Sequence, residues 1–122
     1  MTDSTWDESK LMVYVISDSI GETGELIAKA SVRQFDTKDY AIKRFPYTNT
    51  VEQVKPLLED AAKHKRALVV YTNVDKDTRA YMKQKERELN LHMVDVMGPP
   101  MDEIQSILGY EPMRQPLSLI HI

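Results

Sequence analysis

Cysteine is absent from this 122-residue sequence. Its absence excludes disulfide bonds and thiolate metal sites, and it is consistent with a reducing compartment. Long hydrophobic runs are also lacking, because no apolar segment approaches the roughly 18 residues that a membrane-spanning helix needs. The polar, acidic N-terminus has neither the basic segment nor the apolar core of a signal peptide. We therefore expect a cytoplasmic protein without a membrane partner.

An excess of positive charge is the third feature that the sequence lacks. The formal net charge is -3, whereas general nucleic-acid binders are usually basic, so no nucleic-acid partner is expected. Apolar residues make up 42% of the chain and charged residues 29%, which is typical of a globular domain. The length suits one domain. We predict a disordered tail over residues 1–9 and one α/β domain over residues 10–116.

Four short apolar segments alternate with stretches of helical spacing. The first, residues 11–17, is apolar nearly throughout and predicts a strand that is covered on both faces. The second, residues 40–47, contains Pro46, which cannot donate to a sheet ladder and therefore favours an edge strand. The remaining strands are predicted over residues 66–74 and 91–98. Helices are predicted over residues 21–35, from Thr50, after Asp75 and over residues 101–110. Thr50 and Gln53 have the spacing of a capping box, Asp75 can cap the helix that follows it, and Asn90 suits the end of that helix.

This alternation predicts an α/β fold with an open, mostly parallel sheet of about four strands and helices on both faces. The expected strand order is 2-1-3-4, as in one half of a flavodoxin-like or Rossmann-like domain. In such sheets ligands bind beyond the carboxyl ends of the strands, near the switch point between strands 1 and 3. The residues that follow the first strand are therefore the first candidates for a site.

The segment that follows the first strand, "SDSIGETGE", has two interpretations. Ser19 and Glu22 have the spacing of a capping box, which would explain both residues as the start of a helix. On that helix we expect Leu26, Ile27, Ala30 and Val32 to share the buried side. Alternatively, the backbone N–H groups and the dipole at the helix N-terminus hold a phosphate or a carboxylate. Spacing alone leaves both interpretations open.

The candidate ligand-binding residues come from this segment and from two neighbouring strand ends. The acidic side chains among them disfavour a highly charged anion unless an Arg or a metal intervenes, and Arg44 could bind an anion through two nitrogens. We identify no catalytic residue and no metal site. The candidates are Ser17, Asp18, Ser19, Gly21, Glu22, Thr23, Arg44 and Thr72.

Several segments in order resemble one protein family. "YVISDSIGETGELIAKA" is similar to the N-terminus of the bacterial regulatory proteins of pyruvate, phosphate dikinase and of phosphoenolpyruvate synthase. "IKRFPY", "LVVYTNVD" and "VDVMGPPMDEIQSILGYEPMRQP" follow in the family's order, so the resemblance runs from about Met12 to Pro116. Departures are Gly24, where the family commonly has Ala, and Pro56.

The resemblance implies a bifunctional serine/threonine protein kinase and pyrophosphorylase. Such enzymes phosphorylate a Thr of the dikinase or synthase, with ADP as donor for the dikinase, and remove that phosphate with inorganic phosphate to release pyrophosphate. The resemblance also implies that ADP or ATP is bound by a P-loop in the C-terminal half, and this sequence contains no such segment. We therefore expect an inactive N-terminal fragment, with exposed apolar surface around the last helix and Tyr110 where a second domain would pack.

The last six residues, Leu117–Ile122, read "LSLIHI". They match the in-frame translation of a transposon adaptor end used in sequencing libraries, so we expect a non-native tail over residues 117–122; the alternative is a natural amphipathic tail.

A second interpretation of the whole chain is a stand-alone, non-enzymatic anion-binding or nucleotide-binding module of flavodoxin-like type. The sequence leaves open whether dikinase or synthase is the target and whether the protein forms a homo-oligomer.

Overall fold

The computed structural model describes residues 9–116. The tail predicted over residues 117–122 and residues 1–8 of the tail predicted over residues 1–9 lie outside this range. Ser9, which the prediction placed in the N-terminal tail, is described. Its hydroxyl donates to Asp39, and its carbonyl accepts from Arg66.

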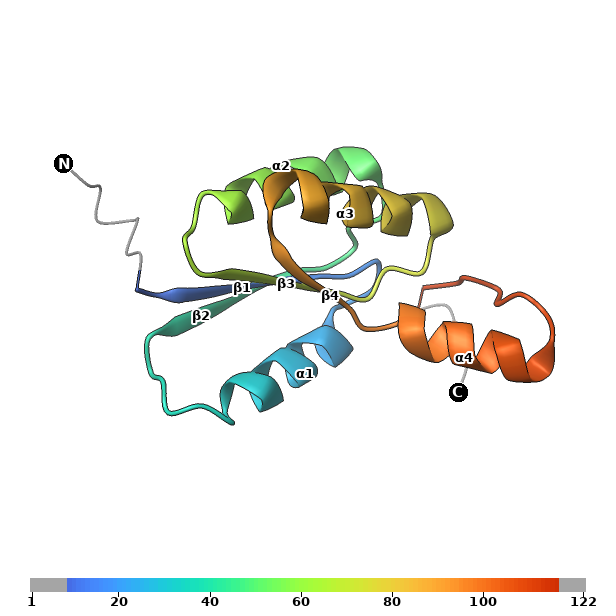
Figure 1. Cartoon of the computed structure of the whole chain (residues 1–122), viewed down its shortest axis with the longest axis horizontal. Helices are drawn as coiled ribbons and strands as arrows, with labels where there is room; N and C mark the ends of the chain where they lie inside the picture. Colours follow the sequence, from blue (N-terminus) through green and yellow to red (C-terminus); the bar gives the residue numbers. More distant parts are fainter. Residues whose placement is uncertain (1–8, 117–122) are drawn as a thin grey trace.

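The sheet has four parallel strands in the order β2-β1-β3-β4, which confirms the predicted topology. Figure 1 shows α2 and α3 on one face, α1 on the other, and α4 beyond the carboxyl ends of the strands. The strands are β1 (Leu11–Ile16), β2 (Tyr40–Phe45), β3 (Ala67–Tyr71) and β4 (His92–Asp95). The helices are α1 (Glu22–Val32), α2 (Val51–Ala62), α3 (Lys76–Leu89) and α4 (Gly98–Leu108).

Strand β1 lies in the middle of the sheet and is buried on both faces, as its apolar composition predicted. Successive side chains of a strand point to opposite faces. Tyr14 and Ile16 accordingly join the core cluster with Leu58 of α2, whereas Val13 and Val15 join the cluster beneath α1. The carboxyl end of β1 is therefore held rigidly from both sides, and the loop that follows it starts from a fixed position.

The capping predictions for α2 and α3 are confirmed. Thr50 accepts from the backbone N–H of Gln53, and the Gln53 side chain accepts from the backbone of Thr50, which completes a capping box. Asp75 accepts from the backbone N–H of Thr78, at a distance of 3.0 Å. At the other end of α3, Asn90 adopts the left-handed conformation with φ 53°.

The predicted buried side of α1 is wrong in part. Leu26, Ile27 and Ala30 are exposed, and Leu26 keeps 67% of its surface in solvent. The side that faces the sheet consists of Gly24, Ala28 and Val32.

Close packing explains this choice of side. A Cβ atom on Gly24 would lie 2.8 Å from Val15 Cγ1, so only a residue without a side chain lets α1 approach β1 this closely. Gly24 therefore has a packing role that outweighs its low helix propensity.

A buried ion pair connects α3, β4 and the start of α4. Arg79 donates to Asp95 Oδ2 from Nε at 3.0 Å and from Nη2 at 2.8 Å, and both side chains are largely buried. Asp95 Oδ1 accepts from the backbone N–H of Gly98 at 2.8 Å. A Cβ atom on Gly98 would overlap both Arg79 and Asp95, so this close approach requires glycine.

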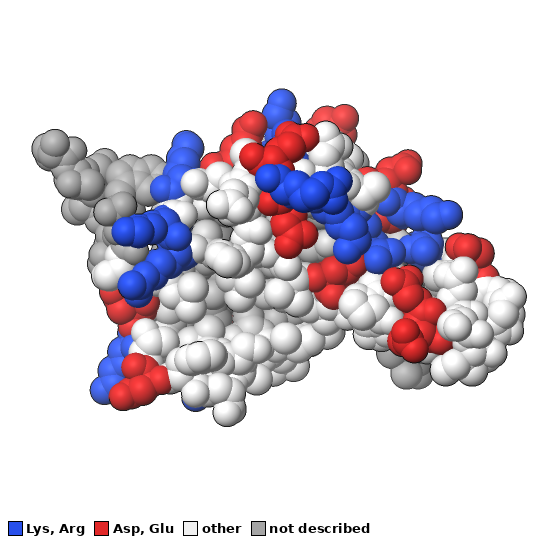
Figure 2. Space-filling model, viewed as in Figure 1, with Lys and Arg blue, Asp and Glu red and all other residues white. Residues whose placement is uncertain are grey.

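Charged side chains gather over α2 and α3 on the face in Figure 2, whereas the part of that face below the sheet is mostly uncharged. Among residues 9–116, no helix combines the length and the apolar character that crossing a bilayer requires.

Candidate anion-binding site

The loop after β1 stays extended because it continues to pair with the chain that follows β2. The N–H of Ser17 donates to the carbonyl of Phe45 at 3.1 Å, and the N–H of Thr48 donates back to Ser17 at 2.8 Å. The N–H of Tyr47 donates to the carbonyl of Ser19 at 2.9 Å. These three bonds keep the backbone of residues 17–19 out of the helix.

The Ser19–Glu22 capping box, one of the two interpretations of this segment, is therefore excluded. The N-cap of α1 is Gly21, with φ 90°, and Glu22 is the first helical residue rather than the third. A left-handed φ of this size favours glycine. A Cβ atom on Gly21 would in addition lie 2.9 Å from the side chain of Arg44. No side chain caps the N-terminus of α1.

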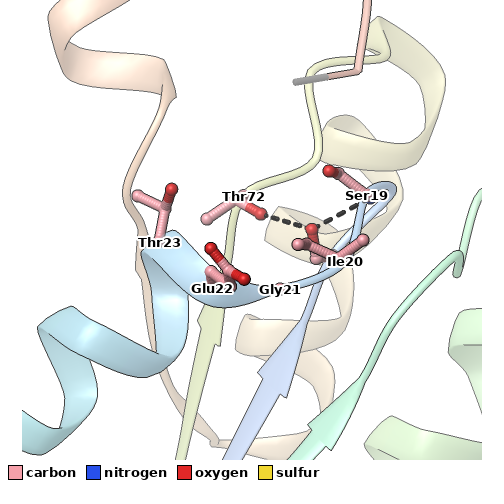
Figure 3. Close-up of a pocket in the computed structure, with 7 residues that line it drawn as sticks. Ser19, Ile20, Gly21, Glu22, Thr23 and Thr72 are labelled. Atoms are coloured by element: carbon pink, nitrogen blue, oxygen red, sulfur yellow. Dashed lines mark hydrogen bonds between the residues drawn. The ribbon is translucent and has the colours of Figure 1, made fainter. Parts of the chain in front are cut away.

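A hollow of about 200 Å³ opens beside the first turn of α1 (Figure 3). It lies at the carboxyl ends of β1 and β3, where the chain leaves the sheet in opposite directions and where the sequence predicted a site. The structure brings six of the eight candidate residues to this hollow, together with Ile20, which the sequence analysis did not single out. The lining residues are Ser17, Ser19, Ile20, Gly21, Glu22, Thr23 and Thr72.

The Ser17 hydroxyl organises the floor of this hollow. Its Oγ accepts from the backbone N–H of Ser19 at 3.0 Å and from Thr72 Oγ1 at 2.9 Å, and both bonds are buried. The dashed lines in Figure 3 mark these two bonds. Ser17 and Thr72 are 1% exposed, so they shape the loop from beneath. Ser17 therefore fixes the backbone of the site and ties it to β3.

The first turn of α1 gives the hollow its electrostatic character. Helix N-termini carry unsatisfied backbone N–H groups and a partial positive charge, which attract anions. Ser19 and Thr23 add hydroxyl groups to the lining, and Glu22 adds a carboxylate. Among the described residues of the hollow there is no Lys or Arg. The arrangement suits one phosphate or carboxylate group better than a polyphosphate.

Arg44 does not line this hollow. Its Nε donates to Glu25 Oε1 at 2.6 Å, and its Nη1 donates to the carbonyl of Ile20 at 3.0 Å. The hydrogen bonds from Arg44 and then Lys29 lower the pKa of Glu25 to about 2, and the bond to Glu25 raises the pKa of Arg44. Arg44 therefore supports the loop from outside, and its charge is already paired with Glu25.

Asp18 is also turned away from the hollow. Its Oδ2 accepts from the backbone N–H of Val74 at 3.0 Å, whereas its Oδ1 is buried without a partner in the described structure. Burial raises the pKa of Asp18, although the hydrogen bond from Val74 opposes that effect. Nearby, Asn73 Nδ2 donates to the carbonyl of Thr48, and Asn73 Oδ1 is likewise buried without a partner. Asp18 thus ties the β1 loop to the end of β3.

We predict that Asp18→Asn changes how stability depends on pH. The folded state holds the Asp18 proton more tightly than the unfolded chain does, so unfolding releases a proton, and the free energy of unfolding falls as pH rises above the ordinary pKa of 3.8. The amide oxygen that the substitution introduces would still accept from Val74, without a buried charge. We expect the stability of the variant relative to the wild type to increase as the pH rises from about 4 to about 7.

Urea denaturation of both proteins at the two pH values measures this difference, and subtraction removes the contribution of every other titrating group. A constant difference between the two proteins across the pH range would contradict the prediction. Asp36→Asn is the matched control, because Asp36 is exposed and its substitution removes the same charge.

One contact at this edge of the sheet had no signal in the sequence. Arg114 folds back from the segment after α4, and its Nη1 donates to the carbonyl of Val74 at 3.1 Å. The segment has no periodic pattern from which this return could be predicted.

Among residues 9–116 there is no cluster of three or more His, Asp or Glu that could hold a metal ion.

Comparisons with known proteins identify the family of this chain. A model of the kinase/pyrophosphorylase family matches residues 13–122. A protein from Carboxydothermus hydrogenoformans, named as a putative pyruvate, phosphate dikinase regulatory protein, is 44% identical over 86% of this chain and 38% of its own length. Proteins of the same name from Alkaliphilus oremlandii and Staphylococcus aureus are 40% and 37% identical, over 89% and 92% of this chain and 39% and 42% of their own lengths.

The chain thus spans about two fifths of the length of these curated relatives. The family match covers most of the sequence and includes the whole β1 loop from Ser17 to Gly21. The chain belongs to the kinase/pyrophosphorylase family.

Proposed function

We propose that this chain is the N-terminal part of a cytoplasmic, bifunctional serine/threonine kinase and pyrophosphorylase that regulates pyruvate, phosphate dikinase. The family match over residues 13–122 carries the proposal, and the names of the relatives support the dikinase as partner. In the forward reaction a phosphoryl group passes from ADP to a Thr hydroxyl and leaves AMP. In the second reaction inorganic phosphate takes the phosphoryl group from the phosphorylated Thr, which yields pyrophosphate and the free hydroxyl.

The hollow beside α1 is the part of the site that this chain contributes. Its hydrogen-bond donors fit one phosphate group, either inorganic phosphate or the phosphorylated Thr of the target. A nucleotide fits it less well, because Glu22 lies in the lining and no Lys or Arg does. We assign ADP or ATP to the part of the full-length protein outside this chain, where it would supply or accept the phosphoryl group. This chain would then bind and orient the phosphate.

The absence of a P-loop supports an inactive fragment. No G-x-x-x-x-x-K-[ST] segment occurs in the 122 residues, and in P-loop enzymes phosphoryl transfer depends on this cradle for the phosphates. The decisive assay therefore uses the full-length protein with purified dikinase, and with phosphoenolpyruvate synthase as the competing target. ADP-dependent labelling of a dikinase Thr, reversed by phosphate, is the expected result. Labelling of the synthase alone would reassign the target, and labelling of neither would refute the proposal.

Thr23→Asp in the full-length protein tests the role of the hollow. A carboxylate in the first turn of a helix interacts favourably with the helix dipole, so the substitution should not impair folding. The same carboxylate would repel a phosphate in the hollow, and we expect the phosphate-dependent reaction to slow by roughly tenfold.

Gln34→Glu is the matched control, because it adds the same charge at an exposed position beyond the end of α1. Steady-state rates at varied phosphate concentration, with thermal unfolding of each variant, measure the two effects separately. Equal phosphate dependence in Thr23→Asp and Gln34→Glu would remove the hollow from the proposed site.

A further inference from the structure

Helix α4 and the segment after it expose a group of large apolar side chains, which we call the α4 surface. Ile107 keeps 79% of its surface in solvent and Tyr110 keeps 67%, which agrees with the exposed surface predicted around the last helix. Figure 1 shows why: α4 stands beyond the carboxyl ends of the strands instead of covering a face of the sheet. The α4 surface consists of Ile104, Ile107, Leu108, Tyr110 and Met113.

The α4 surface borders a preformed groove. Met101, Ile104 and Leu108 recur at helical spacing along one side of α4. With Met97, the N-cap of α4, and the segment that follows the helix, they line a groove of about 380 Å³. The hydrogen bond from Arg114 to the carbonyl of Val74 holds that segment in place. The groove is therefore built into the fold, since both of its walls are fixed.

Of the two acidic residues on α4, Asp102 lies on another side of the helix, whereas Glu103 lies one turn before Ile107. Asp102 shares a separate hollow with Ser106 and Gly109. Figure 2 shows the part of the visible face formed by α4 as mostly uncharged, with a few acidic side chains. A helix with one apolar and one polar side normally buries the apolar side against another element. Contiguous exposed apolar surface of this kind marks an interaction site.

We propose that the polypeptide following residue 116 in the full-length protein packs on the α4 surface. This inference rests on the proposed function, because it takes the chain as part of a longer enzyme. The relatives are about two and a half times as long as the matched region, so more than half of each lies outside it. Gln115 lines the groove, so the described part of the chain ends beside the α4 surface.

The position of the α4 surface gives this packing a consequence for the site. α4 follows β4 at the carboxyl edge of the sheet, and the hollow beside α1 opens at the same edge. Polypeptide seated on α4 is thereby brought to the edge where the hollow lies. The α4 surface thus positions the nucleotide-binding part of the enzyme against the phosphate site of this chain.

Thiol labelling of the full-length protein tests the proposal. This chain has no cysteine, so Ile107→Cys and Ser106→Cys each add one thiol to α4, and mass spectrometry of the α4 peptide follows its modification. Ser106 lies on the polar side with Asp102 and is the matched control. Both positions are exposed in the present chain, so without cover their labelling rates should be similar. We expect the thiol of Ile107→Cys to react at least tenfold more slowly than the thiol of Ser106→Cys.

Each other outcome overturns the proposal. Equal rates would mean that the α4 surface stays open. Protection that disappears on dilution would assign it to a second copy, and protection that appears only with added dikinase would assign it to the target protein. Kinase activity measured on the same samples separates the two proposals: activity without protection refutes this inference alone, and protection without activity refutes the proposed function alone.

Discussion

Replacing Arg79 by Ala should destabilise the domain by about 3 kcal/mol, because it leaves the carboxylate of Asp95 buried without its main partner. The Asp95 side chain is only 6% exposed, and Arg79 supplies two of the hydrogen bonds to its Oδ2. The N–H of Gly98 would still donate to Oδ1, which keeps the cost at the lower end of the range for broken buried pairs. Urea denaturation should show the loss as a lower midpoint at unchanged slope.

Lys83→Ala is the matched control for Arg79→Ala. Lys83 Nζ lies 3.9 Å from the same Asp95 oxygen, but its side chain is 52% exposed, so removing it should change the stability by less than about 1 kcal/mol. Equal effects of the two substitutions would show that net charge near Asp95 matters and that the buried geometry does not.

Gly98→Ala should lower the stability about as much as Arg79→Ala does, because its Cβ would occupy the space of the Arg79–Asp95 pair.

Ser17→Ala should cost about 1–3 kcal/mol of stability, since it removes the acceptor of a buried backbone N–H, that of Ser19. Ser19 is only 4% exposed, so water cannot readily replace the lost partner. The loop would then lose the constraint that holds the hollow open beside α1. In the full-length protein we expect the phosphate-dependent reaction to weaken together with the stability, which thermal unfolding and steady-state rates would measure.

Thr72→Val separates the two hydrogen bonds of Ser17. It removes the hydroxyl that donates to Ser17 but leaves Ser17 able to accept from Ser19, and valine has almost the same shape as threonine. We expect a loss of less than about 1 kcal/mol and an intact loop. If Thr72→Val were as damaging as Ser17→Ala, the link to β3 rather than the bond to the Ser19 N–H would determine the shape of the site.

The residues around the hollow explain why a capping interpretation and a binding interpretation both fitted the sequence. Hydroxyl and carboxylate side chains near a helix start serve either purpose, and spacing does not distinguish them. The structure excludes the capping box, because Ser19 is held by the chain after β2 and Gly21 begins the helix. With no side-chain cap on α1, its N-terminus is left for a ligand, which is the basis of the proposed phosphate site.

The sequence by itself determined the elements and their order in the sheet. Apolar runs such as residues 11–17 and capping pairs such as Thr50 with Gln53 are local signals, and short right-handed connections leave few topologies for them. The same order placed Ser17 and Thr72 at one edge of the sheet. The family could likewise be predicted from the sequence, because its motifs are contiguous stretches of the chain.

Only the tertiary structure decided which side of each element is used. Gly24 faces β1 because close packing there excludes a side chain, although the pattern of apolar residues favoured Leu26. Arg44 and Asp18 turn away from the hollow because each finds a partner far along the chain, in Glu25 and in the N–H of Val74. Such contacts depend on how segments distant in the sequence pack together, and the local spacing of residues does not predict that packing.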